Sequence, residues 1–279
     1  MAENRERGHE VWVVIACLAI VCEVGMCWAL WWLWHSSLPP EEAKTVVVTV
    51  EKPAEAEVPA QPASRLAQMI EAGEVRSIRL VGDSITAGFG TDGYALGSEE
   101  DGSAVVYDDG MGTVHFESSL SASCWANAFR AYATSKGISS FVNAGINGAF
   151  MAELADDPEA WLQGGADVIF VALGTNDAGY YGVDEYRAAA EAGLAAAAEK
   201  SKLVVALAPV RDLRPTDSLV EPASQLGDVL REVCDAHGYE FVDPRDAVTP
   251  DLFCDDGLHP NSQGSLAIWS CIQQILPKS

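Results

Sequence analysis

Residues 80–88 read Leu-Val-Gly-Asp-Ser-Ile-Thr-Ala-Gly, and here an apolar strand pattern breaks into a glycine-flanked turn that carries one serine. The apolar side chains before Gly82 predict a buried strand, and the glycine predicts its end. Open α/β folds bind their ligands at the carboxyl ends of parallel strands, so this strand would deliver Ser84 to the binding edge. A serine hydroxyl is a weak nucleophile unless a base takes its proton. The sequence must therefore supply a histidine elsewhere.

That histidine lies near the other end of the chain, in the stretch Asp256-Gly257-Leu258-His259-Pro260. An imidazole acts as a general base most effectively when a carboxylate fixes its orientation. Asp256 and Asp255 both precede His259 closely enough to take that role. The segment around Ser84 and the segment at residues 256–260 are thus predicted to meet at one site.

Strand and helix patterns alternate along the rest of the chain, as repeated β-α units do. Residues 168–173 read Val-Ile-Phe-Val-Ala-Leu, a continuous apolar run typical of a strand buried on both faces. Five strands separated by helices predict a parallel sheet with helices on both faces. The predicted strands are 77–81, 140–143, 168–173, 203–207 and 240–242, and the predicted helices are one that starts at Arg65, then 124–134, 151–154, 159–162, 183–199, 223–236 and 262–275.

Residues 89–121 interrupt this alternation and predict a loop insertion near the site, rich in glycine and aspartate. The stretch Gly88-Phe89-Gly90-Thr91-Asp92-Gly93 matches the dinucleotide fingerprint G-x-G-x-x-G, but that fingerprint must open a helix and polar, glycine-broken sequence follows instead. The acidic residues of the insertion lack the spacing of a known calcium loop, which favours a solvated loop.

The charge and the cysteine content of the chain limit which partners and cofactors it is expected to bind. A net charge of −24 leaves no basic face for nucleic-acid phosphates. No cysteine or histidine group has metal-ligand spacing, and no cofactor is predicted. Four of the seven cysteines fall in the predicted domain. In an extracellular domain they would allow two disulfides in three pairings, and buried free thiols are the alternative. These four are Cys124, Cys234, Cys254 and Cys271.

Residues 11–34 form an apolar run whose only charge is Glu23. As a helix the run would span about 36 Å, which is enough to cross a hydrocarbon core of about 30 Å. Arginines before the run place residues 1–10 in the cytoplasm and the rest of the chain outside, by the positive-inside rule. A cleaved signal peptide is the alternative, although no small-residue cleavage site follows. Residues 35–64 are rich in proline and glutamate and predict a stalk before a domain at 65–279.

Two further strand ends carry polar turns, residues 143–148 (Asn-Ala-Gly-Ile-Asn-Gly) and 174–177 (Gly-Thr-Asn-Asp). On a parallel sheet these turns gather at the same edge as Ser84. Acyl transfer through a serine needs hydrogen-bond donors at the developing oxyanion, and backbone N–H groups beside glycine together with an asparagine amide can supply them. The sequence therefore contains the residue types that acyl transfer through a serine needs.

With these four segments in order, the chain resembles an SGNH hydrolase of the GDSL esterase/lipase family. Gly82-Asp83-Ser84-Ile85 matches the nucleophile block, Gly145 the glycine block, residues 174–177 the asparagine block and residues 256–260 the acid and base block. The resemblance implies a flavodoxin-like, three-layer α/β/α sandwich with a five-stranded parallel sheet, preceded here by the single N-terminal transmembrane helix.

The resemblance also implies the roles of individual residues. Ser84 would be the nucleophile, His259 the general base and acid, and Asp256 the residue that orients His259, because the family spaces acid and base as D-x-x-H. The oxyanion hole would consist of the backbone N–H groups of Ser84 and Gly145 and the side chain of Asn176, with no metal ion. Asp83 and Asp177 are expected to brace the loops by hydrogen bonds.

These features together predict a membrane-anchored extracellular serine ester hydrolase that acts on a small-molecule or glycan ester, for example by removing acetyl groups from carbohydrates. An O-acetyltransferase is an alternative, because the same three residues serve if a sugar hydroxyl replaces water. A noncatalytic binding module on an esterase scaffold is the alternative from another class. Substrate choice is expected to reside in the insertion at residues 89–121.

Overall fold

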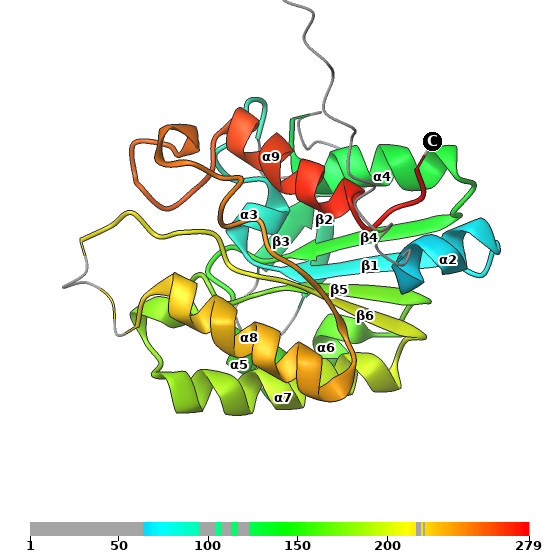
Figure 1. Ribbon diagram of the computed structural model, residues 1–279, viewed down its shortest axis with the longest axis horizontal. Coiled ribbons are helices and arrows are strands. Elements are labelled where there is room, and N and C mark those ends of the chain that lie inside the picture. Colours follow the sequence, from blue (N-terminus) through cyan, green and yellow to red (C-terminus); the bar gives the residue numbers. More distant parts are fainter. Residues whose placement is uncertain are drawn as a thin grey trace, which may run out of the picture. The chain divides into compact units, whose positions relative to one another are not determined.

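The structure of the protein is a computed structural model, which describes residues 64–94, 104–107, 113–116, 123–215, 219 and 221–278. Five strands form one parallel sheet in the order β4-β1-β5-β6-β7 (Figure 1). All five strands were predicted from the sequence. Their bounds are β1 Ser77–Gly82, β4 Ser140–Gly145, β5 Val168–Ala172, β6 Leu203–Leu207 and β7 Glu240–Val242.

Helices cover both faces of the sheet, because successive side chains of a buried strand point to opposite faces. In β5, Val168 and Phe170 pack with the helices above the sheet in Figure 1, and Ile169 and Val171 pack with those below. This is the predicted three-layer arrangement. The helices above are α2 Arg65–Glu71, α4 Trp125–Ser135 and α9 Ser262–Gln273, and those below are α5 Met151–Asp156, α6 Pro158–Leu162, α7 Val183–Glu199 and α8 Ala223–His237.

The insertion contains more structure than the sequence predicted. Two strands pair antiparallel in it, β2 (Ala104–Tyr107) and β3 (Thr113–Phe116), in a region expected to be loop. A four-residue helix, α3 (Ser84–Ala87), also follows β1 directly. Residues 88–93 form turns and a bend and open no helix, in agreement with the rejection of the dinucleotide fingerprint.

Several predictions concern residues that the structure does not describe. The proposed cytoplasmic tail, membrane anchor and most of the stalk lie outside the described residues. Among the residues that are described, no helix combines the length and the apolarity needed to cross a membrane. The four cysteines of the domain are free thiols, and Cys124 and Cys234 are buried in opposite helical layers.

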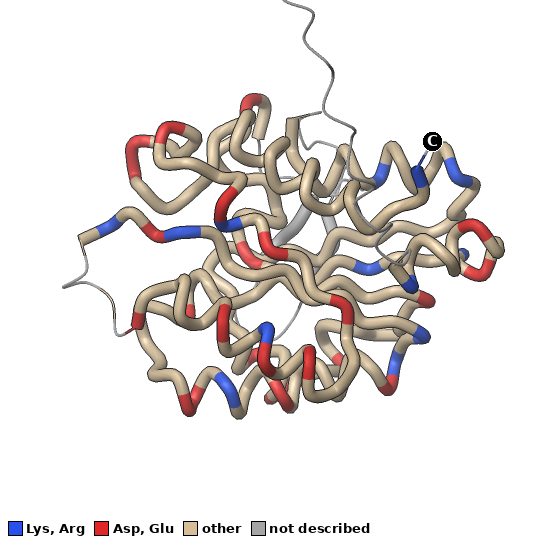
Figure 2. The backbone as a smooth tube through the Cα atoms, in the orientation of Figure 1, with Lys and Arg blue, Asp and Glu red and all other residues tan. Residues whose placement is uncertain are grey.

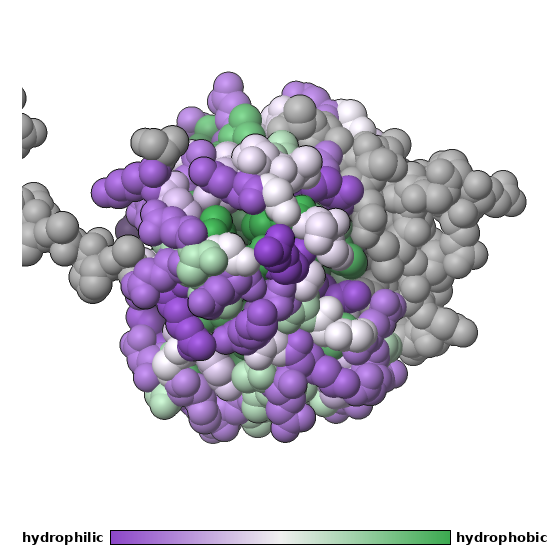
Figure 3. Space-filling view, turned by 90° about the vertical axis from the view of Figure 1, so that its right-hand side faces the viewer, coloured by the Kyte–Doolittle hydropathy of each residue, from purple (hydrophilic) through white to green (hydrophobic). Residues whose placement is uncertain are grey.

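Charged and polar residues dominate the described surface. Acidic positions are frequent on the lower helices α7 and α8 and in the connecting loops, with basic positions among them (Figure 2). On the face shown in Figure 3, hydrophilic residues cover most of the described surface and apolar atoms show only in small separate areas. Exposed apolar side chains are therefore few, and their positions are informative.

Candidate active site

The strand order brings three polar loops together. Gly82 at the end of β1 lies between Gly145 of β4 and Ala172 of β5 in the sheet register. The chain moves from β1 to β4 on one side and later returns to β5 on the other, which makes this edge a topological switch point, where open α/β sheets bind ligands. Ser84, the loop after β4 and Asn176 all follow these three strand ends.

Ser84, His259 and Asp256 form one hydrogen-bonded chain. Ser84 Oγ lies 2.8 Å from His259 Nε2, and His259 Nδ1 lies 2.7 Å from Asp256 Oδ2. These are the distances at which a serine proton can pass to an imidazole whose other nitrogen is held by a carboxylate. Asp256, rather than Asp255, faces the ring. The structure thus brings together three residues that are separated by up to 175 positions in the sequence.

Backbone hydrogen bonds fix the loop that carries His259. Asp256 Oδ1 accepts from the N–H groups of Leu258 (2.9 Å) and His259 (3.0 Å), and the Cys254 N–H donates to the His259 carbonyl (2.8 Å). Partial burial would by itself raise the pKa of Asp256. The hydrogen bonds from the backbone and ring of His259 and from Leu258 outweigh it and lower that pKa to about 2. Asp256 is therefore ionised at neutral pH.

Phe89 and Gly90, which follow the helix of Ser84, contact the loop that carries His259. The Phe89 ring lies 4.4 Å from the His259 ring, centroid to centroid. Gly90 has φ +89°, and a Cβ there would come within 2.8 Å of the Pro260 carbonyl oxygen and 3.1 Å of the His259 Cβ. This glycine of the nucleotide-like stretch thus allows the histidine loop to approach closely.

The short helix α3 is held by groups from outside it, because four residues cannot satisfy their own carbonyls. The Ser84 carbonyl accepts from the N–H groups of Gly88 and Phe89, the latter at 2.9 Å. The Ile85 carbonyl accepts from the indole N–H of Trp125 (3.2 Å), and the Thr86 carbonyl accepts from Asn143 Nδ2 (2.9 Å). Asp83 caps the other end, since its Oδ1 accepts from the Ile85 N–H (2.9 Å).

Asn143 is a site residue whose role the sequence did not reveal. It is fully buried. Its Oδ1 accepts from the Gly145 N–H at 3.0 Å, and its Nδ2 donates to the Thr86 carbonyl. A Cβ on Gly145 would meet the Ala87 nitrogen at 2.5 Å, so a glycine is required here for packing. The N–H that was expected to face an oxyanion is thus engaged by Asn143.

Asn176 precedes the turn η1 (Asp177–Gly179), which follows β5. One hydrogen of its amide nitrogen goes to the Ala149 carbonyl at 2.9 Å. An amide nitrogen carries two hydrogens, so Asn176 Nδ2 has a second hydrogen that it can donate to another acceptor. In the loop between β4 and α5, Gly148 is exposed and has φ +83°, and a Cβ added to it would have no atom within 4 Å.

Asp83 and Asp177 are buried carboxyl groups that brace loops, as expected. Both oxygens of Asp177 accept from the Met151 N–H at 3.1 Å, which fixes the start of α5. Burial raises the pKa of Asp83 to about 6 and, together with repulsion from Asp83 and Glu153, raises the pKa of Asp177 to about 7. The sequence could not show that acids 94 positions apart share one buried region.

Exposed apolar side chains gather around the site. Tyr180 is 71% exposed and packs edge-on against Phe150, with 5.3 Å between ring centroids. Phe89 and Leu213 are each 40% exposed, and the Leu213 N–H donates to the carbonyl of Gly257 in the histidine loop (2.8 Å). None of these three was singled out from the sequence as a site residue, because an aromatic or leucine in a loop carries no signal of its own.

Known proteins resemble this chain in sequence and in fold. The profile of the GDSL-like Lipase/Acylhydrolase family matches residues 80–267. LAE5, an alpha/beta hydrolase enzyme from the metagenome of Lake Arreo, Spain, is similar in structure (TM-score 0.54, 19% identity, 72% of this chain and 94% of that chain covered). Axe2, an acetylxylan esterase from Geobacillus stearothermophilus, is similar to the same degree (0.54, 18%, 72% and 94%).

A member of the lipolytic protein G-D-S-L family from Veillonella parvula DSM 2008 is also similar (TM-score 0.53, 16% identity, 71% of this chain and 97% of that chain covered). At these identities the likeness concerns the fold. No curated protein matches the sequence.

Proposed function

The chain belongs to the GDSL-like lipase/acylhydrolase family and is an ester hydrolase of that family, and on this premise we propose that Ser84, His259 and Asp256 carry out its reaction. Ser84 Oγ attacks the ester carbonyl carbon as His259 Nε2 takes its proton, and His259 then protonates the departing alcohol. The resulting acyl-enzyme is cleaved by a water that His259 deprotonates. The observation that carries the proposal is the unbroken hydrogen-bonded chain from Ser84 Oγ to Asp256 Oδ2.

We assign the oxyanion to the backbone N–H of Ser84 and the second amide hydrogen of Asn176. Because the Gly145 N–H is engaged by Asn143, the third donor would come from further along the same loop. Gly148 is the favoured position, since it is exposed and faces open space. Each such donor typically lowers the barrier by about 3 kcal/mol.

The proposed substrate class is a short-chain ester on a carbohydrate. Tyr180 and Phe89 offer exposed aromatic surface beside Asn176 and His259, and an aromatic face can cover the apolar face of a sugar ring while its edge stays in water. The ionised Asp256 carboxylate beside His259 and the net charge of −24 disfavour an anionic substrate. An acetylxylan esterase among the structural neighbours agrees with this class.

Release of p-nitrophenol from its acetate ester tests the hydrolase. Wild-type chain is expected to turn over, and Ser84→Ala is expected to lose essentially all activity, because no other nucleophile adjoins His259 in the hydrogen-bonded chain. A fluorophosphonate probe should label Ser84 covalently in the wild type. Undiminished turnover by Ser84→Ala would remove the assignment.

A comparison of substrates tests the carbohydrate class. Tyr180→Ala is expected to raise KM for an acetylated xylo-oligosaccharide at least fivefold more than it raises KM for p-nitrophenyl acetate, which has no sugar to stack. Leu266→Ala is the matched control, since Leu266 is also exposed (38%) but lies on α9. An equal change in both KM values would argue against an aromatic sugar platform.

Membrane anchoring through residues 11–34, with the domain outside the cell, is a further part of the proposal and is supported by the sequence pattern. Full-length chain should remain in the membrane pellet after carbonate extraction, and protease added to intact cells should digest the domain. Deletion of residues 1–34 should leave the domain in the soluble fraction. Protection of the domain in intact cells would reverse the proposed orientation.

A further inference from the structure

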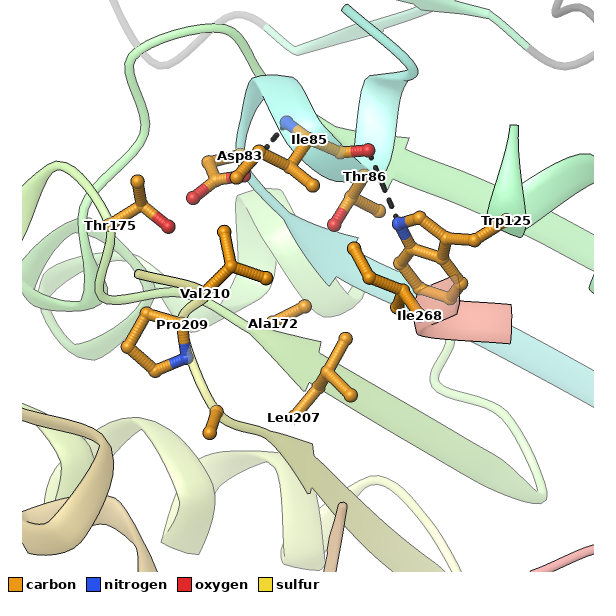
Figure 4. Close-up of a pocket in the computed structure, with 11 residues that line it drawn as sticks. Asp83, Ile85, Thr86, Trp125, Ala172, Thr175, Leu207, Pro209, Val210 and Ile268 are labelled. Atoms are coloured by element: carbon orange, nitrogen blue, oxygen red, sulfur yellow. Dashed lines mark hydrogen bonds between the residues drawn. The ribbon is translucent and has the colours of Figure 1, made fainter. Parts of the chain in front are cut away.

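A small cavity lies directly behind the nucleophile helix (Figure 4). About 20 Å³ of it is open to the centre of a water molecule. Asp83, Thr86 and Thr175 contribute polar groups to its wall, and Trp125, Leu207 and Ile268 are among the apolar side chains that complete it. In Figure 4 the hydroxyl oxygen of Thr86 points toward the middle of the ring of lining residues.

Two oxygens in this wall have unused hydrogen-bonding capacity. Asp83 Oδ2 and Thr86 Oγ1 are both buried and find no hydrogen-bond partner among the described residues, although each side chain is only 1% exposed. Burying a polar atom without a partner is costly, because the atom loses its hydrogen bonds to water. A native fold normally avoids that cost with a protein group or an ordered water.

Size and polarity together fit one water molecule. A buried water needs about 10–15 Å³ of such space and two to four polar partners. The cavity offers about 20 Å³, and Asp83, Thr86 and Thr175 bring three polar groups to its wall. A second water would not fit in this volume.

We propose that the cavity binds a single water, which donates a hydrogen bond to Asp83 Oδ2 and bonds Thr86 Oγ1, and that the hydrated Asp83 carboxylate acts as a positioning charge behind Ser84. The inference rests on the proposed serine hydrolase function. When His259 accepts the Ser84 proton it becomes a cation, and a nearby negative charge stabilises that cation. Asp83 thus assists the reaction through His259 without touching the substrate.

The charged groups around Asp83 define its titration. His259 on the histidine loop favours the ionised carboxylate, whereas Asp177 of η1 opposes it, and Tyr186 of α7 also faces this region. Burial raises the pKa of Asp83 to about 6, and the Ile85 N–H, which donates to Asp83 Oδ1, is the leading group that opposes this rise. A water at Oδ2 acts in the same direction as this hydrogen bond.

The pH profile of kcat/KM for p-nitrophenyl acetate tests the proposal on the full chain. Thr86→Val removes the hydroxyl with little change in shape, and the midpoint of the acid limb should rise by about one pH unit, because a carboxylate loses part of its solvation. Thr86→Ser keeps the hydroxyl and should keep the wild-type midpoint. Ile268→Val enlarges the cavity without removing a polar group and should also keep it.

Asp83→Asn provides the decisive background. Asparagine preserves the cap on α3. Because asparagine cannot ionise, residue 83 no longer contributes to the acid limb of the pH profile of this variant. Adding Thr86→Val to Asp83→Asn should leave the midpoint in place, and a shift of the same size in both backgrounds would overturn the role of Asp83.

A crystal structure of the wild-type chain supplies an independent readout. Electron density for a water within hydrogen-bond distance of Asp83 Oδ2 and Thr86 Oγ1 is expected, and an empty cavity would overturn the binding site. If the wild type shows no Ser84-dependent hydrolysis, the proposed function fails instead. The density in the cavity still decides whether the water is bound.

Discussion

Replacing Asp177 by asparagine should flatten the dependence of stability on pH. Asp177 is fully buried, and burial first, then repulsion from Asp83 and Glu153, raises its pKa from an ordinary 3.8 to about 7. A carboxyl whose pKa is raised on folding binds its proton more tightly in the native state. Stability is therefore lost as pH rises from the unfolded pKa toward the folded one.

The expected loss of unfolding free energy depends on the pH interval over which it is measured. Between pH 5 and pH 7 the unfolded carboxyl is already ionised while the native one still holds its proton, and each unit is worth about 1.4 kcal/mol. Asp177 should thus account for a loss of about 2–3 kcal/mol between pH 5 and pH 8. Asparagine cannot ionise, and its oxygen can still accept from the Met151 N–H.

Urea unfolding followed by circular dichroism at pH 5 and pH 8 measures this difference. Groups that titrate independently of Asp177 contribute equally to wild type and variant, so they cancel in the comparison. Asp251→Asn is the control, because Asp251 is exposed and the hydrogen bond from Thr249 lowers its pKa, which keeps it ionised throughout the interval. Equal changes in unfolding free energy from pH 5 to pH 8 in wild type and Asp177→Asn would refute the reasoning.

Three further outcomes are expected. Asn143→Ala removes the side chain that bonds the buried Thr86 carbonyl and the Gly145 N–H, and it should lower the free energy of urea unfolding by about 3 kcal/mol. The control Asn147→Ala removes one half-buried hydrogen bond to Tyr94 and should lower it by less than about 1 kcal/mol. Similar losses in the two variants would contradict the structural role of Asn143. Asp256→Asn should reduce kcat about 10⁴-fold on p-nitrophenyl acetate, because the imidazole loses its orienting carboxylate, and a loss under tenfold would argue that another group orients His259. Gly90→Ala should reduce kcat/KM at least tenfold by displacing the histidine loop, whereas Gly73→Ala, also at positive φ but with nothing within 4 Å, should keep it.

The sequence predicted the sheet because its strands are strongly patterned. Residues 168–173 are apolar throughout, and β5 is indeed buried on both faces. Helix α3 was missed, because four residues between glycines carry no period and its carbonyls are satisfied by distant groups such as Trp125 and Asn143. The strands β2 and β3 were missed in a glycine-rich segment whose pattern is weak.

The candidate site was partly accessible to the same reasoning. Ser84, His259 and Asp256 could be named because their chemistry is specific and the resemblance supplied the spacing. The engagement of Gly145 by Asn143 could not, since it depends on a side chain that turns back two residues. The cavity behind Asp83 was equally hidden, because its wall draws on α4, β6 and α9 as well as the loop after β1.

The dependence of α3 on outside groups has a consequence for how the enzyme folds. One turn of helix is not stable by itself, because nucleation is unfavourable before tertiary contacts form. Residues Ser84–Ala87 can therefore become ordered only after α4 and β4 have docked, since Trp125 and Asn143 supply the donors. During refolding, the far-UV helical signal should therefore return before catalytic activity, and the recovery of turnover reports the last step of assembly.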